Sequence, residues 1–312
     1  MRIVFFGTPE FAIPSLRALV GEGFDVAAVV TQPDRPKGRS RSRLEPPPVK
    51  SAALAEGIPV FQPEQPNSPE FLEQLAPLKP DLGVVVAYGH ILRKELLELP
   101  HLGMINVHAS LLPKLRGAAP IQHAIIEGYR ETGVSVMQMD EGMDTGPVLL
   151  RVPTPIGPDE TGGELAGRLA ELGALALIEA LTLLAGGAAH PEPQDHREAT
   201  YAPKITRELA RIRWDDDPER IARLVRALDP EPGAWTRLKL REVKLFVPQV
   251  LDWWDEQQRS LPGTVLATDP GLVVATDSAA VRFMECQPAG KSRMATVAWA
   301  RGRGIKVGDR FE

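Results

Sequence analysis

The chain has 312 residues, of which 43% are hydrophobic and 25% charged, and its formal net charge is −5. These values are typical of a soluble globular protein of one or two domains. No apolar run approaches the roughly 20 residues that a membrane helix needs. The single cysteine, Cys286, excludes a disulfide framework and a cysteine-based zinc site within one chain. We therefore expect a cytoplasmic protein with no metal site, in which Cys286 is a small buried residue.

Short apolar runs alternate with stretches of helical period along the first part of the chain. We expect no signal peptide, because the first apolar run begins at residue 2 and reads as a core strand. The runs expected to be strands are residues 2–6, 25–31, 58–62, 81–89, 103–108, 131–139 and 146–156. The stretches expected to be helices are residues 11–23, 49–57, 68–78, 119–128 and 160–185. This alternation predicts an α/β, Rossmann-like domain with a mostly parallel sheet. Ligands of such sheets bind beyond the carboxyl ends of the strands, where Tyr88, Asn106 and His108 are expected.

The composition changes near residue 207. Residues 1–207 are net acidic, whereas residues 208–312 are close to neutral and contain all five tryptophans. The proline-rich, polar segment 190–207 is typical of a linker. Beyond it we expect one helix over 218–228 and then short, turn-punctuated strands, a spacing that indicates a small OB-like β-barrel. We therefore divide the chain into a first domain (1–189), a linker (190–207) and a second domain (208–312).

Three familiar motifs fail on closer inspection. Asp144-Thr-Gly is the local signature of aspartic proteases, but those need two such carboxylates and the chain has one copy. A phosphate loop ending at Gly290-Lys-Ser would need glycine where Glu285 stands. The first strand turns into its helix through GTPEF rather than GxGxxG, so a dinucleotide site is unsupported.

Asn106, His108 and Asp144 are the candidate catalytic set. Asn106 and His108 share one face of a strand, because side chains alternate with period two. Asp144 follows in a loop that the sheet can bring to the same edge. An amide donor, an imidazole and a carboxylate suit attack on a carbonyl-type carbon, in which an oxyanion is held and a proton is moved. From the residues alone, a hydrogen-bonded structural histidine, a capping asparagine and an Asx-turn aspartate remain open alternatives.

The runs around these residues, NVHASLLPKLRGAAP and MDEGMDTGP, closely resemble the formyltransferases that use 10-formyltetrahydrofolate. The similarity continues through FFGTPEFA, VVTQPDRPKGR, VVAYG, GVSVMQMD, ARIRW and QPAGK, and so spans nearly the whole chain. It implies that Asn106, His108 and Asp144 are catalytic. It also implies that the SLLP segment binds the folate co-substrate through Ser110, Leu111, Leu112 and Pro113. Ala109 departs from the glycine or proline of many relatives, and we expect little consequence from so small a residue.

Two basic regions are candidates for binding the acceptor. Residues 35–43 contain five basic residues in nine and no acid, and the resemblance implies that this loop contacts a tRNA acceptor end, with Arg39, Arg41 and Arg43 as candidates. Without the resemblance, a solvated surface loop is favoured. In TRLKLR, a strand would place Arg237, Lys239 and Arg241 on one face, with Leu238 and Leu240 toward the core. Small barrels with basic faces are common nucleic-acid platforms.

The resemblance thus implies a monomer that moves a formyl group from 10-formyltetrahydrofolate to the α-amino group of methionine on initiator tRNA, with no membrane partner. One alternative is a formyltransferase for a small amine, either a glycinamide ribonucleotide or an amino sugar. The basic loop and the second domain argue against it. Another is an inactive folate- or tRNA-binding module, against which the intact Asn-His-Asp set argues.

Overall fold

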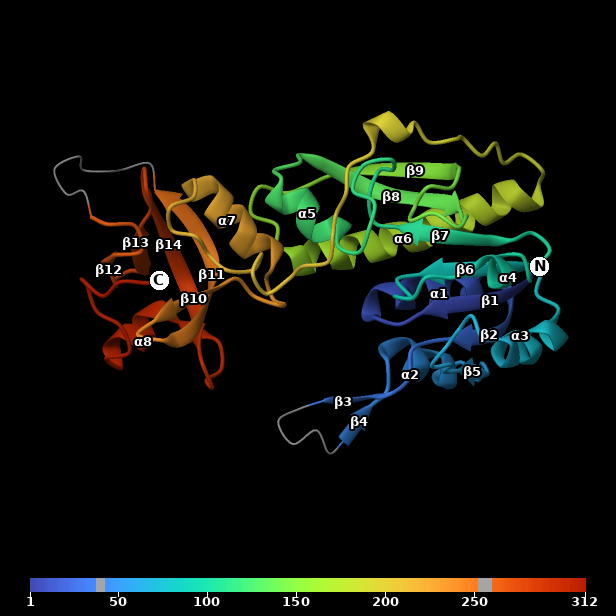
Figure 1. Cartoon of the computed structure of the whole chain (residues 1–312), viewed down its shortest axis with the longest axis horizontal. Coiled ribbons are helices and arrows are strands. Elements are labelled where there is room, and N and C mark those ends of the chain that lie inside the picture. The colour runs from blue at the N-terminus through green and yellow to red at the C-terminus, as the bar shows by residue number, and fades with distance from the viewer. Residues whose placement is uncertain (38–42, 252–259) are drawn as a thin grey trace. The chain divides into compact units, whose positions relative to one another are not determined.

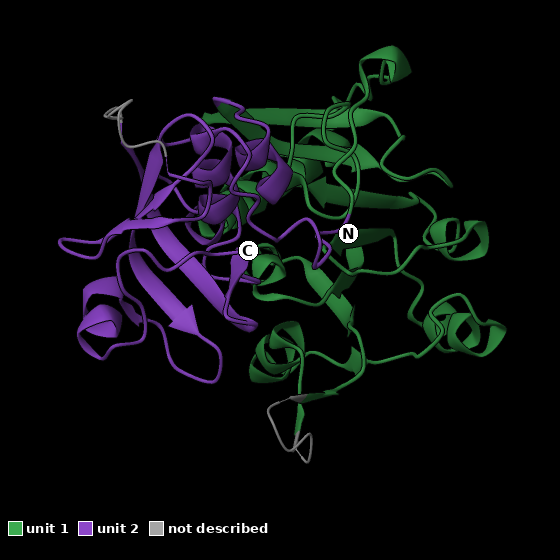
Figure 2. Ribbon diagram, turned by 60° about the vertical axis from the view of Figure 1, so that its left-hand side comes forward, with its two compact units in different colours: residues 1–120, 131–155, 166–203 green, residues 121–130, 156–165, 204–312 purple. Residues whose placement is uncertain are grey.

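The computed structural model describes residues 1–37, 43–251 and 260–312 (Figure 1). The chain forms two compact units, which Figure 2 colours separately. Unit 1 comprises residues 1–120, 131–155 and 166–203, and unit 2 comprises residues 121–130, 156–165 and 204–312. No helix in the described ranges is long and apolar enough to cross a bilayer.

The observed division does not coincide with the expected boundaries. Most of the expected linker belongs to unit 1, because Glu192 pairs with Val148 and the Gln194 side chain is buried. Two segments from the middle of the expected first domain cluster with unit 2 instead. Proline and polar content indicated a linker, but these features carry no information about pairing with a distant strand.

The main sheet of unit 1 has the strand order β5-β2-β1-β6-β7-β8-β9, which can be followed in Figure 1. The strands are β1 (Arg2–Gly7), β2 (Asp25–Val30), β5 (Val60–Phe61), β6 (Leu82–Val86), β7 (Met104–His108), β8 (Glu131–Gln138) and β9 (Val148–Pro155). Pairing is parallel from β5 to β7 and antiparallel from β7 to β9. The predicted mostly parallel sheet is therefore confirmed.

Four of the helices that accompany this sheet were predicted from the apolar periodicity: α1 (Ile13–Gly21), α2 (Pro48–Ala55), α3 (Pro69–Leu75) and the long α6 (Gly162–Ala185). The short α4 (Lys94–Leu97) was not predicted, and 3-10 turns η1 (Glu10–Ala12), η2 (Ala76–Leu78) and η3 (His196–Glu198) complete the helical elements. Helix α3 begins at Pro69 because the Ser68 hydroxyl accepts the Phe71 backbone N–H at 3.3 Å. At Gly173, α6 approaches Val107 of β7 so closely that a Cβ atom would lie 3.0 Å from that side chain.

A small hairpin leaves the carboxyl end of β2. Its strands, β3 (Arg35–Lys37) and β4 (Arg43–Glu45), pair antiparallel. At its base, the Asp34 carboxylate accepts hydrogen bonds from Gln62 at 2.7 Å and Lys50 at 2.8 Å, and these bonds lower the pKa of Asp34. The expected tRNA contacts Arg39 and Arg41 lie outside the described residues.

Unit 2 is built on a curled antiparallel sheet with the path β10-β11-β14-β13-β12 and β15 beside β14. Its elements are α5 (Pro120–Ile126), α7 (Pro218–Ala227), β10 (Trp235–Leu238), β11 (Arg241–Leu251), β12 (Val265–Ala267), β13 (Leu272–Ala275), β14 (Ala280–Pro288), β15 (Met294–Ala295) and α8 (Thr296–Arg301). Helix α7 begins after Asp217, whose carboxylate accepts the N–H groups of Glu219 and Arg220. This sheet confirms the expected small-barrel architecture.

The final residues connect the two ends of that sheet. Phe311 bridges to Leu238 of β10, and Arg310 bridges to Thr264 beside β12. The Phe311 ring stacks on Trp214 with centroids 5.5 Å apart, and Phe283 meets Trp214 edge-on at 5.8 Å. The carboxyl-terminal segment 308–312 is therefore part of both the sheet and the core of unit 2.

The expectation that TRLKLR is a single strand is wrong. Strand β10 ends at Leu238, and Lys239 and Leu240 form a two-residue turn in which both have positive φ, 49° and 68°. Leu240 is 82% exposed rather than directed to the core. Alternation of charged and apolar residues predicted an uninterrupted strand, whereas the hairpin needs its turn at this point.

Candidate functional site

Strand β7 brings Asn106 and His108 to the carboxyl edge of the unit 1 sheet. Asn106 lies opposite Met137 and His108 opposite Ser135 of β8, which fixes the register of both. The two residues stand two apart on the strand and so project to the same side. The Asn106 side chain is partly exposed and makes no hydrogen bond within the described part of the chain, whereas His108 is buried. The Asn106 amide is therefore available to a ligand.

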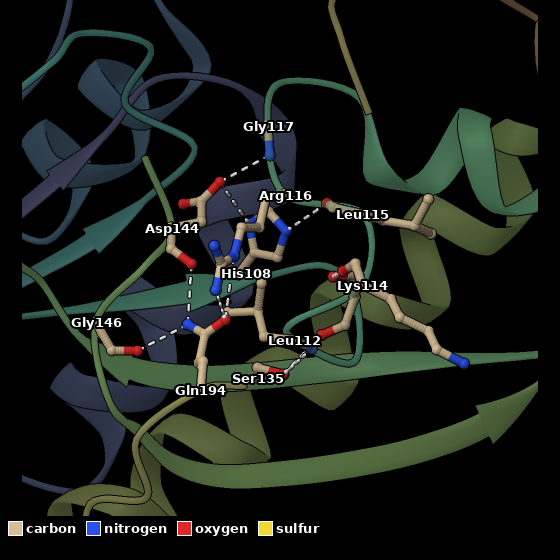
Figure 3. Close-up of polar contacts among 11 residues, drawn as sticks. His108, Leu112, Lys114, Leu115, Arg116, Gly117, Ser135, Asp144, Gly146 and Gln194 are labelled. Atoms are coloured by element: carbon tan, nitrogen blue, oxygen red, sulfur yellow. Dashed lines mark hydrogen bonds and ion pairs between the residues drawn. The ribbon is translucent and has the colours of Figure 1, made fainter. Parts of the chain in front are cut away.

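Both ring nitrogens of His108 have a defined neighbour (Figure 3). Nε2 lies 3.0 Å from the carbonyl oxygen of Leu115. Because a carbonyl oxygen can only accept, Nε2 carries a hydrogen and donates the hydrogen bond. Nδ1 lies 3.7 Å from Oδ2 of Asp144, beyond hydrogen-bond distance but within reach of its charge. Nδ1 is consequently the ring atom that can exchange a proton or donate to a substrate.

Asp144 is held in a left-handed backbone conformation, with φ 54°. Its Oδ2 accepts the backbone N–H of Gly117 at 2.8 Å. Gly117 has φ 121°, and a Cβ atom there would lie 2.7 Å from the carbonyl oxygen of Ala202. A glycine is therefore required at 117 for the N–H to reach the carboxylate. The structure brings His108 and Asp144 together, as the sequence predicted.

The SLLP segment forms a tight loop immediately after β7. The Ser110 hydroxyl donates to the Lys114 carbonyl at 2.6 Å, and the Ser135 hydroxyl bridges Ser110 O and Leu112 N–H. Ser110 and Leu112 are buried, whereas Leu111 and Pro113 are partly exposed. Of the four expected folate contacts, the side chains of Leu111 and Pro113 are thus the accessible ones, while Ser110 and Leu112 shape the loop.

Sequence reasoning missed two residues of this site. Arg116 is 2% exposed, and its guanidinium donates to the side-chain oxygen of Gln194, which comes from the segment expected to be a linker. Gln194 in turn contacts the loop that carries Asp144. Neither residue had a signal in the sequence, because the contact joins positions 78 apart and the 190–207 composition is that of a loop.

The basic residues of unit 2 surround Trp235. The guanidinium carbons of Arg207, Arg211 and Arg237 lie 4.7, 5.6 and 5.6 Å from the centre of its ring. Arg207 also pairs with Glu242. In the described ranges, Arg237 and Arg241 have no acidic partner, and both side chains are exposed.

The structure gives a different result for the other two predicted tRNA contacts, Lys239 and Arg43. Lys239 pairs with Asp309 at 3.2 Å, so its charge is partly compensated. For Arg43 the structure gives only the backbone, at the start of β4.

The unit 1 arrangement can stabilise a negatively charged oxygen and move one proton. The Asn106 amide is a donor, Nδ1 of His108 can accept a proton or, once protonated, donate a hydrogen bond, and the Asp144 carboxylate lies 3.7 Å from Nδ1. Among the described residues, no group of three His, Cys, Asp or Glu side chains is placed to hold a metal ion.

Comparison with known proteins gives consistent results. The family described as "Formyl transferase" matches residues 1–181, and "Formyl transferase, C-terminal domain" matches residues 204–304. The methionyl-tRNA formyltransferase of Symbiobacterium thermophilum is 48% identical, covering 100% of this chain and 95% of the relative. That of Desulfotalea psychrophila is 49% identical, covering 98% and 94%.

Solved structures share the fold at lower identity. HypX from Aquifex aeolicus in complex with tetrahydrofolic acid has a TM-score of 0.65 and 23% identity, covering 98% of this chain and 48% of that one. Methionyl-tRNA formyltransferase from Clostridium thermocellum has a TM-score of 0.56 and 18% identity, covering 81% and 95%.

Proposed function

This chain belongs to the formyl transferase family, and from that premise we propose that it transfers the formyl group of 10-formyltetrahydrofolate to the α-amino group of methionine on initiator tRNA. The observation that carries the proposal is the approach of His108 Nδ1 to Asp144 Oδ2, 3.7 Å, beside the unpaired Asn106 amide. The near-full-length similarity to methionyl-tRNA formyltransferases supports this choice of acceptor over a small amine.

In this reaction the free amine attacks the formyl carbon, and negative charge develops on the formyl oxygen. Collapse of the tetrahedral adduct then breaks the bond between the formyl carbon and N10, and N10 takes up the proton lost by the amine as tetrahydrofolate leaves. The Asn106 amide and the protonated Nδ1 of His108 donate hydrogen bonds to that oxygen. The Leu115 carbonyl fixes Nε2 as a donor, so the ring cannot turn Nδ1 away without losing this bond. The chain thus supplies two oriented donors, and no nucleophilic side chain is required.

Asp144 supports the positive charge on His108 and assists removal of a proton from the attacking amine. Its Oδ2 is held by the Gly117 N–H, so the carboxylate keeps its orientation as the imidazole changes charge. Both groups are shielded from water, with 6% and 16% of their side chains exposed, which strengthens their electrostatic interaction.

We assign folate binding to the loop Ser110, Leu111, Leu112 and Pro113. Leu111 and Pro113 offer apolar contacts at the rim, and the buried Ser110 and Leu112 fix the loop's backbone for hydrogen bonding to the co-substrate.

We assign tRNA binding to the exposed arginines of unit 2 and to the basic segment 35–43 of unit 1. Among the described residues no carboxylate pairs with Arg237 or Arg241, so both charges suit phosphate groups, and Trp235 orients Arg237. Arg39, Arg41, Arg43 and Lys239 remain proposed contacts, with Lys239 weakened by Asp309. Catalysis and folate binding are assigned to unit 1. We further propose that the protein is cytoplasmic and acts as a monomer.

The test is to incubate the purified protein with 10-formyltetrahydrofolate and methionyl initiator tRNA and to follow formyl transfer. Methionyl elongator tRNA and free methionine are the controls. Transfer confined to the initiator is the expected result, whereas transfer to a small amine but to no tRNA would overturn the proposed acceptor.

A further inference from the structure

The Gln194 side chain clamps the backbone on both sides of Thr145. Its amide nitrogen donates to the carbonyl oxygen of Asp144 at 2.9 Å and to that of Gly146 at 2.7 Å. Figure 3 shows the amide directed at both carbonyls. Gln194 is 6% exposed, so these bonds form in a site shielded from water, where their loss would leave carbonyls unpaired.

The orientation of that amide is dictated by Arg116. The Gln194 Oε1 accepts from Nε of Arg116 at 3.2 Å and from Nη2 at 2.6 Å. A flipped amide would set its NH2 against the guanidinium and its oxygen against two carbonyls, so only one orientation is compatible with both neighbours. Arg116 therefore fixes which atom of Gln194 faces the Asp144 loop.

Arg116 is itself anchored on several sides. Its Nη1 lies 3.2 Å from Nδ1 of His196, and its backbone pairs with Thr200 and Ala202. In the part of the chain that the structure describes, no carboxylate lies within ion-pair distance of this buried guanidinium. Its polar partners are thus the Gln194 oxygen and His196, which links the segment 194–202 firmly to the loop after β7.

The clamped residue needs such support. Asp144 carries a positive φ, which is unfavourable for a side chain with a Cβ, and such conformations persist where the surroundings hold them in place. We propose that Gln194, oriented by Arg116, is a positioning residue that holds the Asp144 carboxylate beside His108. This inference rests on the proposed function, since it names a residue that sets the geometry of the same site.

The decisive variant is Gln194→Glu. A glutamate keeps the acceptor that faces Arg116 and adds an opposite charge, but it replaces the donor that faces Asp144 O and Gly146 O with a third oxygen. The Arg116 contact is therefore retained, while the new carboxylate oxygen repels the carbonyl oxygens of Asp144 and Gly146. We expect kcat for formyl transfer to fall by about ten- to a hundredfold, with KM for either substrate within about twofold of the parent.

Gln194→Met, which removes donor and acceptor together, is the second variant, and Asp195→Asn is the matched control. Asp195 is the next residue, is exposed, and pairs with Arg197 rather than with the Asp144 loop. The control should retain parental kcat. A folded Gln194→Glu protein with parental kcat, or one in which KM alone changes, would overturn the proposal.

A measurement on the parent protein removes any dependence on variant folding. With glutamine side chains labelled with 15N, the clamped Gln194 NH2 should exchange its protons with water at least about tenfold more slowly than the exposed glutamines. Exchange at the rate of an exposed amide would show that the clamp is absent. If the parent protein transfers no formyl group, the proposed function fails, while this exchange still reports on the clamp.

Discussion

The candidate functional residues of the two units differ in their exposure to water. In unit 1, His108, Asp144 and Arg116 are withdrawn from water, and each is fixed by hydrogen bonds to neighbouring backbone or side chains. In unit 2, Arg237 and Arg241 stand exposed, and Arg237 lies over the Trp235 ring. The buried, hydrogen-bonded arrangement suits chemistry in which the reacting groups must be positioned to within a few tenths of an ångström. The exposed arrangement suits a polyanion that is held by charge.

The largest expected effect comes from the buried site. The proposed role of Asn106 and His108 as donors to the developing oxyanion predicts that Asn106→Ala and His108→Ala each lower kcat by about 10²- to 10⁴-fold. Single-turnover transfer to methionyl initiator tRNA measures this. His101→Ala, which removes an exposed imidazole, is the control. Near-parental rates for Asn106→Ala would remove Asn106 from the mechanism.

A smaller effect is expected at Gly117, whose backbone N–H donates a hydrogen bond to the Asp144 carboxylate. Gly117→Ala adds a Cβ atom 2.7 Å from Ala202 O at a φ of 121°, so the loop must move and the N–H leaves Asp144. We expect a loss of about 1–3 kcal/mol in the free energy of unfolding and a fall of about tenfold or more in kcat.

Gly187→Ala is the matched control for that change. Gly187 also has positive φ, 65°, but a Cβ atom there meets nothing within 4 Å. The variant should lose stability alone, as measured by chemical denaturation. Equal loss of activity in both variants would mean that the Gly117 contact has no special role.

Weaker effects are expected on the exposed surface. Arg237→Ala and Arg241→Ala should each raise KM for tRNA a fewfold, leave kcat unchanged, and lower the slope of log affinity against log salt by about one. Arg17→Ala removes the same charge from an exposed position on α1 and should change neither quantity. A fall in kcat for the unit 2 variants would erase the contrast between the two units.

The smallest expected effect concerns the interior of unit 2. Burial raises the pKa of the Cys286 thiol to about 12, so almost no thiolate is present at pH 8. We expect no labelling by a thiol reagent in the native protein and complete labelling after denaturation. Rapid native labelling would show that the core of unit 2 opens readily to the reagent.

Much of the architecture could be predicted from local patterns. The buried strands β1 and β6 are largely continuous apolar runs, and the start of α3 follows from Ser68 and Pro69. The burial of Cys286 is confirmed as well. These features depend on residues that are close in sequence, so hydrophobic periodicity and helix-capping residues are enough to predict them.

The remaining features depend on long-range contacts or on backbone geometry that composition does not encode. The pairing of Glu192 with Val148 and the Arg116–Gln194 contact join segments far apart in sequence. The turn at Lys239 and Leu240 uses positive φ at residues that rarely adopt it. Asn106 and His108 could be proposed because they end a strand, and Asp144 because the runs around all three resemble a known family. Gln194, in a segment that resembled a linker, had no local signature.

The carboxyl-terminal segment 308–312 has a practical consequence for handling the protein. Because Phe311 joins β10 and Arg310 the start of β12, removing these residues would leave two strand edges unpaired and Trp214 without its stacked neighbour. Unpaired edges are templates for association between chains. Trimming by a carboxypeptidase should therefore convert a dispersed sample into an aggregating one, even though the residues removed lie far along the chain from His108 and Asp144.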